Sequence, residues 1–129
     1  MKQFIFGKML IDGNGGKPLA NPVVVVEDKY IQQIGDEQSI KIPAGAHIIN
    51  RNSETLMPGL VDSHCHAGED SKRPESIRVQ HTKPAPLRAI RGYISLLQDL
   101  NGGVTTMRLL GDGDGLIDKI LRDAINDGE

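Results

Sequence analysis

The chain has 129 residues, of which 38% are hydrophobic and 25% are charged, and its formal net charge is −2. This balance is typical of a globular protein of ordinary domain size, and it provides no basic field that would attract a nucleic acid. The longest apolar run, residues 23–26, is far shorter than the roughly 20 residues that a membrane span needs. The single cysteine, Cys65, rules out an internal disulfide and favours a cytoplasmic location, where thiols stay reduced.

Residues 1–56 predict a small β-rich domain. Short apolar or β-branched runs alternate there with turn signals, and the runs are residues 4–10, 23–26, 30–34, 40–42 and 47–49. The segment Glu27-Asp28-Lys29 separates two of them and is typical of a tight hairpin turn. Several short strands at this spacing indicate a small sheet or sandwich.

The pattern then changes from strands alone to strands and helices. Residues 55–66 predict a strand that runs into polar residues, and the polar residues 67–83 predict a long loop. Beyond Pro86, apolar residues recur at helical spacing. Asn101-Gly102-Gly103 is a typical end for that helix.

A second strand and helix follow in the same order. Residues 104–110 predict a strand, residues 111–115 a glycine-rich loop, and residues 116–125 a second amphipathic helix. Alternation of this kind favours parallel βαβ units and therefore an α/β fold for the second half of the chain.

Two histidines, His64 and His66, stand at the end of the strand predicted for residues 55–66. In a strand, residues i and i+2 point to the same face, so both imidazoles share a face with Asp62, whereas Cys65 faces the other way. Active sites of α/β folds form at the carboxyl ends of the strands. Because imidazole is the commonest metal ligand, the pair predicts a metal site, with zinc as the expected ion. The alternative is two polar residues at the edge of a loop.

The segment Met57-Pro58-Gly59-Leu60-Val61-Asp62-Ser63-His64-Cys65-His66 resembles the signature of the amidohydrolase superfamily. In that family, a Pro-Gly-hydrophobic-hydrophobic-Asp-x-His-x-His segment forms the first strand of a (β/α)8 barrel. The β-rich residues 1–56 are similar to the family's small N-terminal sheet domain. Gly103-Val104-Thr105-Thr106-Met107-Arg108 is similar to its second barrel strand, most of all in the imidazolonepropionase-related branch with its prolidase-like dipeptidases. Leu109 differs from the Asp that this branch often has.

This resemblance implies two domains. Residues 1–56 would form the β-rich part of a composite sandwich, and residues 57–129 would form the first two βα units of a truncated (β/α)8 TIM barrel. A complete barrel takes about 250 residues. The family's remaining ligands and its proton-shuttling Asp would follow Glu129. No catalytic residue is therefore assigned in this chain, and the chain alone is expected to be inactive.

The resemblance also implies the chemistry of the complete protein. His64 and His66 would bind one or two divalent ions, with zinc expected, and a metal-activated water would attack the carbon of a C–N bond. The expected substrate is an Xaa-Pro dipeptide or a peptide with a C-terminal basic residue, and a cyclic amide or imidazolone is the alternative. The expected partners are this small molecule and a second copy of the chain, because two parallel strands leave unpaired edges.

Three other side chains are candidates for supporting roles. Asp62 is expected to hold a histidine or a backbone amide. Arg108 ends the second predicted strand, where it either binds a substrate carboxylate with two parallel hydrogen bonds or pairs with Asp112 or Asp114. His81 lies in the predicted long loop, where it either contacts substrate or is an ordinary loop residue.

A second hypothesis has no catalysis in it. The chain would then be a truncated module that oligomerises, or binds a partner, through its open sheet edges. The coding sequence beyond Glu129 discriminates the two hypotheses, because the enzyme requires further metal ligands there and the module does not.

Overall fold

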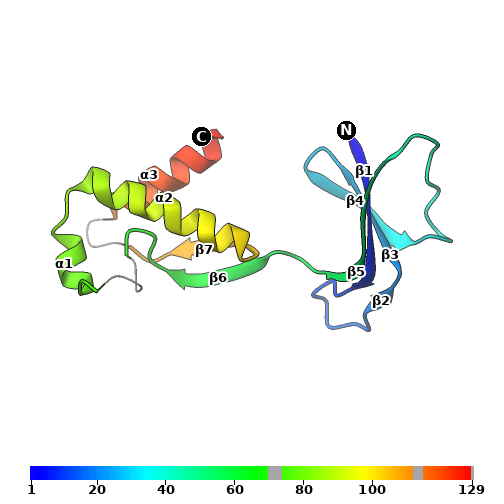
Figure 1. The fold of residues 1–129 in the computed structure, drawn as a ribbon, viewed down its shortest axis with the longest axis horizontal. Coiled ribbons are helices and arrows are strands. Elements are labelled where there is room, and N and C mark those ends of the chain that lie inside the picture. Colours follow the sequence, from blue (N-terminus) through cyan, green and yellow to red (C-terminus); the bar gives the residue numbers. More distant parts are fainter. Residues whose placement is uncertain (70–73, 112–114, 129) are drawn as a thin grey trace. The chain divides into compact units, whose positions relative to one another are not determined.

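The computed structural model of the chain describes residues 1–69, 74–111 and 115–128. They fall into two units, Met1–Pro58 and Gly59–Glu129, and each unit has its own sheet. The first unit is built of strands and the second of strands and helices, as Figure 1 shows. Among the described residues, no helix combines the length and the apolar character that crossing a membrane requires.

The first unit is a five-stranded sheet centred on β1. Its strands are β1 (Lys2–Leu10), β2 (Leu19–Ala20), β3 (Pro22–Glu27), β4 (Tyr30–Asp36) and β5 (His47–Leu56). Strand β1 pairs antiparallel with β2 and β3 and parallel with β5, and β4 extends the sheet beyond β3. The predicted hairpin is confirmed, because Glu27 pairs with Tyr30 across a two-residue turn.

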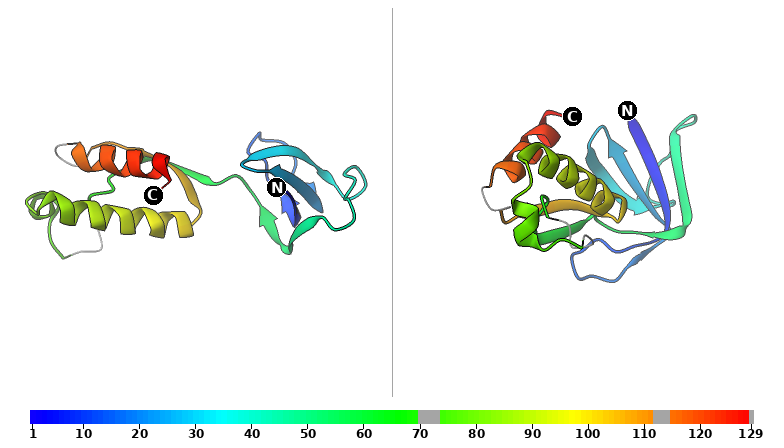
Figure 2. Two further views of the ribbon diagram at one scale, coloured as in Figure 1. Left: turned by 90° about the horizontal axis from the view of Figure 1, so that it is seen from above. Right: turned by 60° about the vertical axis from the view of Figure 1, so that its left-hand side comes forward.

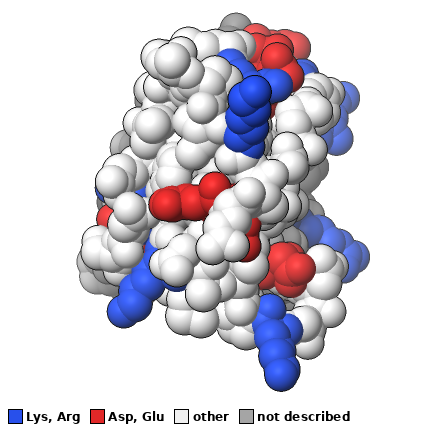
Figure 3. Space-filling model, turned by 90° about the vertical axis from the view of Figure 1, so that its right-hand side faces the viewer, with Lys and Arg blue, Asp and Glu red and all other residues white. Residues whose placement is uncertain are grey.

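The core of this unit lies on one face of the sheet. Its buried members are Phe4, Phe6, Val23, Val25 and Ile40. The β-branched run at residues 23–26 is largely buried, as its composition predicts, and Val23 is fully buried. Around this core the charged groups are mixed: Lys and Arg alternate with Asp and Glu over the face in Figure 3, which therefore presents no field of a single sign.

One predicted strand of this unit is wrong. Residues 40–42 form no strand, although Ile40 is buried in the core. The chain turns instead at residues 37–39, where the carbonyl of Asp36 accepts the N–H groups of Ser39 and Ile40. The apolar side chain of Ile40 was a correct signal of burial, but burial alone does not make a strand.

The second unit places helices beside a pair of parallel strands. The strands are β6 (Leu60–Cys65) and β7 (Val104–Leu109), and their parallel pairing confirms the predicted βαβ connection. The helices are α1 (Ile77–His81), α2 (Ala85–Asn101) and α3 (Leu116–Asp127). Helices α2 and α3 run side by side (Figure 2). A buried cluster of Ala67, Ile117 and Leu121 joins them to the end of β7.

Glycines end both long helices, as the sequence predicts. Gly102 caps α2, and Gly128 caps α3 with a φ of 84°, in the left-handed region that favours glycine. Much of the apolar stripe of α2 is exposed, however. Ile90, Ile94 and Leu100 are 59%, 48% and 54% accessible, so the described part of this unit covers these side chains only in part.

The prediction of a long loop over residues 67–83 needs correction. The structure has helix α1 at Ile77–His81, and Ser76 caps it by accepting the N–H of Val79. Residues 70–73 lie outside the described residues. The sequence offered a Ser at the cap position, but one helical turn is too short for an apolar period to appear.

Candidate metal centre

The two candidate ligands lie together at the carboxyl end of β6. His64 is the last but one residue of β6, and His66 is the first residue after the strand. Their ring centroids are 5.4 Å apart, with the planes inclined at 60°. His64 is exposed and His66 half-buried, so both rings can be reached from solvent. The spacing of the two histidines predicted this proximity.

A hydrogen bond fixes which nitrogen of His66 carries the proton. Nδ1 of His66 lies 2.5 Å from the carbonyl oxygen of Gly111. Because a carbonyl oxygen can only accept, Nδ1 is the donor, and the neutral ring keeps its lone pair on Nε2. Metal-bound histidines typically donate their other ring nitrogen to a carbonyl or carboxylate in this way. The hydrogen bond at Nδ1 therefore leaves the lone pair of Nε2 available to a metal.

Gly111 is held from both sides. Its N–H donates to Oδ2 of Asp118 at 2.9 Å, from the first turn of α3. The preceding residue, Leu110, donates its N–H to the carbonyl of Cys65, which prolongs the β6–β7 pairing by one bond. Sequence reasoning found neither Gly111 nor Asp118. Their only signals were a glycine after a strand and an acidic residue at the start of a helix.

Asp62 acts on the backbone of the site. Its Oδ1 accepts the N–H of His64 at 2.9 Å, which fixes the backbone immediately before the first imidazole. Cys65 donates its thiol to the carbonyl of Arg108 at 3.6 Å. Burial raises the pKa of the Cys65 thiol, and the nearby charge of Asp62 raises it further. The protonated thiol is therefore favoured at Cys65.

The two other candidates, His81 and Arg108, lie in different surroundings: His81 is beside a carboxylate, and Arg108 is exposed. His81 ends helix α1, and its Nε2 lies 2.6 Å from Oε1 of Glu69, a carboxylate that is 13% exposed. Arg108 is exposed on β7. Its predicted ion-pair partners, Asp112 and Asp114, lie outside the described residues.

A second carboxylate, that of Glu75 just before α1, contacts residues beyond α1. Glu75 lies 3.8 Å from Nζ of Lys83 and 3.4 Å from Nη1 of Arg91, and its carbonyl accepts a bond from the Gln80 amide. These two ion pairs link the residue before α1 to Lys83, which lies between α1 and α2, and to Arg91 on α2. The sequence predicted only a long polar loop around Glu75 and Lys83 and did not predict these ion pairs.

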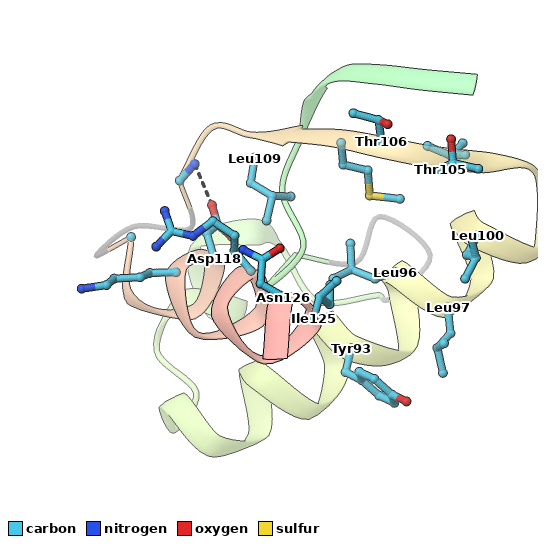
Figure 4. A pocket seen from close by; sticks show the side chains of 16 residues that line it. Tyr93, Leu96, Leu97, Leu100, Thr105, Thr106, Leu109, Asp118, Ile125 and Asn126 are labelled. Carbon is cyan, nitrogen blue, oxygen red and sulfur yellow. Dashed lines mark hydrogen bonds between the residues drawn. The ribbon is translucent and has the colours of Figure 1, made fainter. Parts of the chain in front are cut away.

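A mainly apolar hollow of about 790 Å³ lies between α2, β7 and α3 (Figure 4). Leu96, Leu97 and Leu100 line it from α2, and Ile125 lines it from α3. Asp118 stands at its edge, where the dashed line in Figure 4 marks the bond from Gly111. His66 lines a separate, smaller hollow of about 150 Å³ with Glu69 and Asp99.

The donor set fits part of a metal site. Two imidazoles with one fixed Nε2 suit zinc, which takes nitrogen ligands in tetrahedral geometry. In the described ranges, no group of three or more His, Cys, Asp or Glu side chains converges. The described residues thus offer two nitrogen donors to a metal, whereas a structural or catalytic zinc site has three or four protein ligands.

Known proteins similar to this chain share both its sequence and its fold. No protein-family model matches it. The enamidase of Eubacterium barkeri is 35% identical over 100 residues, which are 76% of this chain and 22% of that protein. The ochratoxinase of Aspergillus niger is 33% identical over 129 residues, 96% of this chain and 25% of that protein. The chain thus spans about a quarter of the length of the curated relatives it matches.

Solved structures of similar fold include proteins of the same kinds. A crystal structure of an Xaa-Pro dipeptidase with bound methionine superposes with a TM-score of 0.83 at 29% identity, covering 99% of this chain and 30% of that one. The A. niger ochratoxinase structure gives a TM-score of 0.76 at 29% identity, covering 98% of this chain and 28% of that one. A crystal structure described as an amidohydrolase gives 0.78 at 27% identity, over 99% and 29% of the two chains. The chain therefore belongs to the amidohydrolase superfamily, and it corresponds to the N-terminal portion of these relatives.

Proposed function

We propose that the complete protein is a metal-dependent hydrolase of an amide or peptide C–N bond, and that His64 and His66 are two of its metal ligands. The observation that carries this proposal is the pair of imidazoles at the end of β6, 5.4 Å apart, with Nδ1 of His66 bonded to a backbone carbonyl. Enamidase, ochratoxinase and the Xaa-Pro dipeptidase are hydrolases by name, which supports the reaction class.

In this proposal, four residues of the chain have defined roles. His64 and His66 hold one or two divalent ions, with zinc expected from the imidazole donors. An ion held by these residues would supply an acidified water molecule and a Lewis acid for the scissile carbonyl. Gly111 orients His66, and Asp62 orients the backbone of His64. The general base and the other ligands are assigned to parts of the protein outside this chain.

The proposed architecture follows the same division. Residues 57–129 are proposed to supply the first two βα units of a (β/α)8 barrel, with the histidines at its catalytic end. Residues 1–56 are proposed to form the β-rich part of a composite sandwich. The two sheets with separate cores support this arrangement.

The proposed substrate is an Xaa-Pro dipeptide, with a peptide bearing a C-terminal basic residue in the same class. Its support is the likeness to the Xaa-Pro dipeptidase structure. Arg108 is the candidate for the substrate carboxylate, because its guanidinium is exposed just before the segment that carries Gly111. A cyclic amide is the alternative, and the likeness to an enamidase supports it.

The metal assignment is tested by histidine substitution in the complete protein. His64→Ala and His66→Ala are each expected to lower the metal content and to reduce kcat/KM by at least about 100-fold, since activity depends on the metal. His47→Ala is the matched control, because His47 is exposed on β5, where its Nδ1 lies 3.4 Å from the amide nitrogen of Gln3. Metal is measured by elemental analysis after dialysis. Unchanged metal content in both variants would contradict the assignment.

A second candidate function is a non-catalytic module that binds a copy of itself or another protein. The exposed apolar stripe of α2 favours it, since Ile90, Ile94 and Leu97 are 59%, 48% and 41% accessible. The same histidine experiment separates the two candidates. A complete protein that neither binds metal nor hydrolyses any peptide or amide would leave the module as the better account.

A further inference from the structure

Two consecutive hydrogen bonds connect helix α3 to the imidazole of His66. Oδ2 of Asp118 accepts the N–H of Gly111 at 2.9 Å, and the carbonyl of Gly111 accepts Nδ1–H of His66 at 2.5 Å. The side chain of Asp118 is thus connected through the backbone of Gly111 to the ring of His66, and Figure 4 shows the bond between Asp118 and Gly111.

We infer that Asp118 is a positioning residue, which fixes the ring orientation and the tautomer of His66 through Gly111. The inference rests on the proposed role of His66 as a metal ligand. Asp118 does not touch a metal in this scheme, and its effect passes entirely through Gly111.

The backbone conformation of Gly111 makes its bond to His66 depend on its other bond, to Asp118. Gly111 has a φ of 97°, in the region that only glycine adopts without strain, and a Cβ placed there would meet nothing within 4 Å. Among the described residues, no neighbouring atom therefore lies on the side of Gly111 where a side chain would be. The bond from its N–H to Asp118 orients it from the side of α3.

Charge strengthens the bond between Gly111 and Asp118. A hydrogen bond to a carboxylate is about twice as strong as one between neutral groups. The negative charge of Asp118 is in turn favoured by the positive end of the α3 dipole, because this residue lies in the first turn of the helix. Asp118 is thus a well-anchored acceptor, and Gly111 passes its orientation on to His66.

The effect on the metal follows from the tautomer. With Nδ1 protonated and bonded, the Nε2 lone pair of His66 is available and its direction is set. Without the Gly111 carbonyl in place, the ring can rotate and can carry its proton on either nitrogen. Metal binding then has to select one orientation and one tautomer, which lowers the affinity.

The first test reads the tautomer without any metal. We would label the complete, metal-free protein with ¹⁵N-histidine and record long-range ¹H–¹⁵N correlations, assigning His66 with His66→Gln. The unsubstituted protein is expected to show the Nδ1–H tautomer at His66. Asp118→Ala is expected to give a mixture, and Asp118→Asn to keep the Nδ1–H form, since the amide oxygen still accepts from Gly111.

The second test measures the affinity of the same proteins for zinc ions by competition with a chelator. Asp118→Ala is expected to weaken zinc binding by about 10- to 100-fold, the usual effect of losing a group that orients a ligand. Asp123→Ala is the matched control, because Asp123 lies on the same helix and bonds to Arg122. Circular dichroism verifies that each variant is folded, and Asp118→Leu, which keeps the size of the side chain but cannot accept from Gly111, carries the test if Asp118→Ala is not folded.

The outcomes separate the inference from the function on which it rests. An Nε2–H tautomer in the unsubstituted protein, or a tautomer that Asp118→Ala leaves unchanged, would overturn the positioning role. A tautomer that shifts in a protein with no zinc affinity would support the link from Asp118 to His66 and overturn the metal assignment instead.

Discussion

At the scale of single residues, short polar contacts between close neighbours in sequence set the local backbone. Asp62 accepts the N–H of His64 two residues on, and Asp36 accepts the N–H of Gln38 in the same way. Such contacts are encoded locally, because Asp readily bonds the backbone two residues ahead. They are the part of the site that a sequence can reveal.

The turn after β4 gives a pH-dependent prediction. The Ser39 hydroxyl and, second, the Ser39 N–H lower the pKa of Asp36 by hydrogen bonding. A lowered folded-state pKa means that this contribution to stability is present above the unfolded-state pKa and is lost as the pH falls through the folded value. Ser39→Ala is therefore expected to raise the pKa of Asp36, measured by NMR titration of the carboxyl carbons.

Asp12 serves as the internal control for this titration. Its pKa is also lowered, but by bonds from Asn14. Ser39→Ala should leave the titration of Asp12 unchanged. A pKa of Asp36 that does not rise in the variant would show that the Ser39 hydroxyl is not the cause of the shift.

At the scale of elements, apolar periodicity predicted the helices of several turns and the strands of several residue pairs. Helices α2 and α3 and the hairpin of β3 and β4 follow from apolar spacing and glycine ends. Helix α1 did not, because five residues give no period. The bond from His66 to Gly111 was equally out of reach, since it joins residues 45 apart and depends on the packing of everything between them.

A close contact between elements gives a prediction for α2. A Cβ added at Gly92 would lie 2.7 Å from Cδ1 of Leu121 and 3.0 Å from the carbonyl oxygen of Ala67. Alanine would favour the helix by about 1 kcal/mol, but forcing α2 away from its neighbours costs about 1–3 kcal/mol. Gly92→Ala is therefore expected to lower the thermal midpoint of unfolding, measured by calorimetry.

The control is Gln98→Ala, at an exposed position of the same helix. It tests helix propensity without the contact, and its midpoint should change little. If Gly92→Ala raised the midpoint, the close approach of α2 to Leu121 and Ala67 would be wrong.

At the scale of the whole molecule, one sequence motif indicated the family correctly, and the relatives confirm it. The motif was sufficient because a Pro-Gly step, a strand and two histidines occur in a fixed order over ten residues. The packing of β7 against β6 explains one part of this order. A Cβ at Gly59 would lie 2.6 Å from Cβ of Thr105, so β7 leaves no room there for a side chain. The substrate is not encoded in so short a segment.

Self-association is the prediction at this scale. The exposed apolar side chains of α2 are expected to drive the 129-residue chain into oligomers, which sedimentation equilibrium would detect. The double variant Ile94→Glu and Leu97→Glu should shift the chain toward monomer. Ile48→Glu, at a residue of β5 that is 50% exposed, is the control and should not. A monomeric unsubstituted chain would contradict this expectation.

The bond between His66 and Gly111 also sets an order of events during synthesis. Gly111 can accept from His66 only after β7 has docked beside β6, and its own anchor, Asp118, is made later still. A nascent chain that has just released His64 and His66 from the ribosome would hold two freely rotating imidazoles. If the proposed metal assignment holds, the geometry of His66 described here can therefore not form on the growing chain before α3 has emerged.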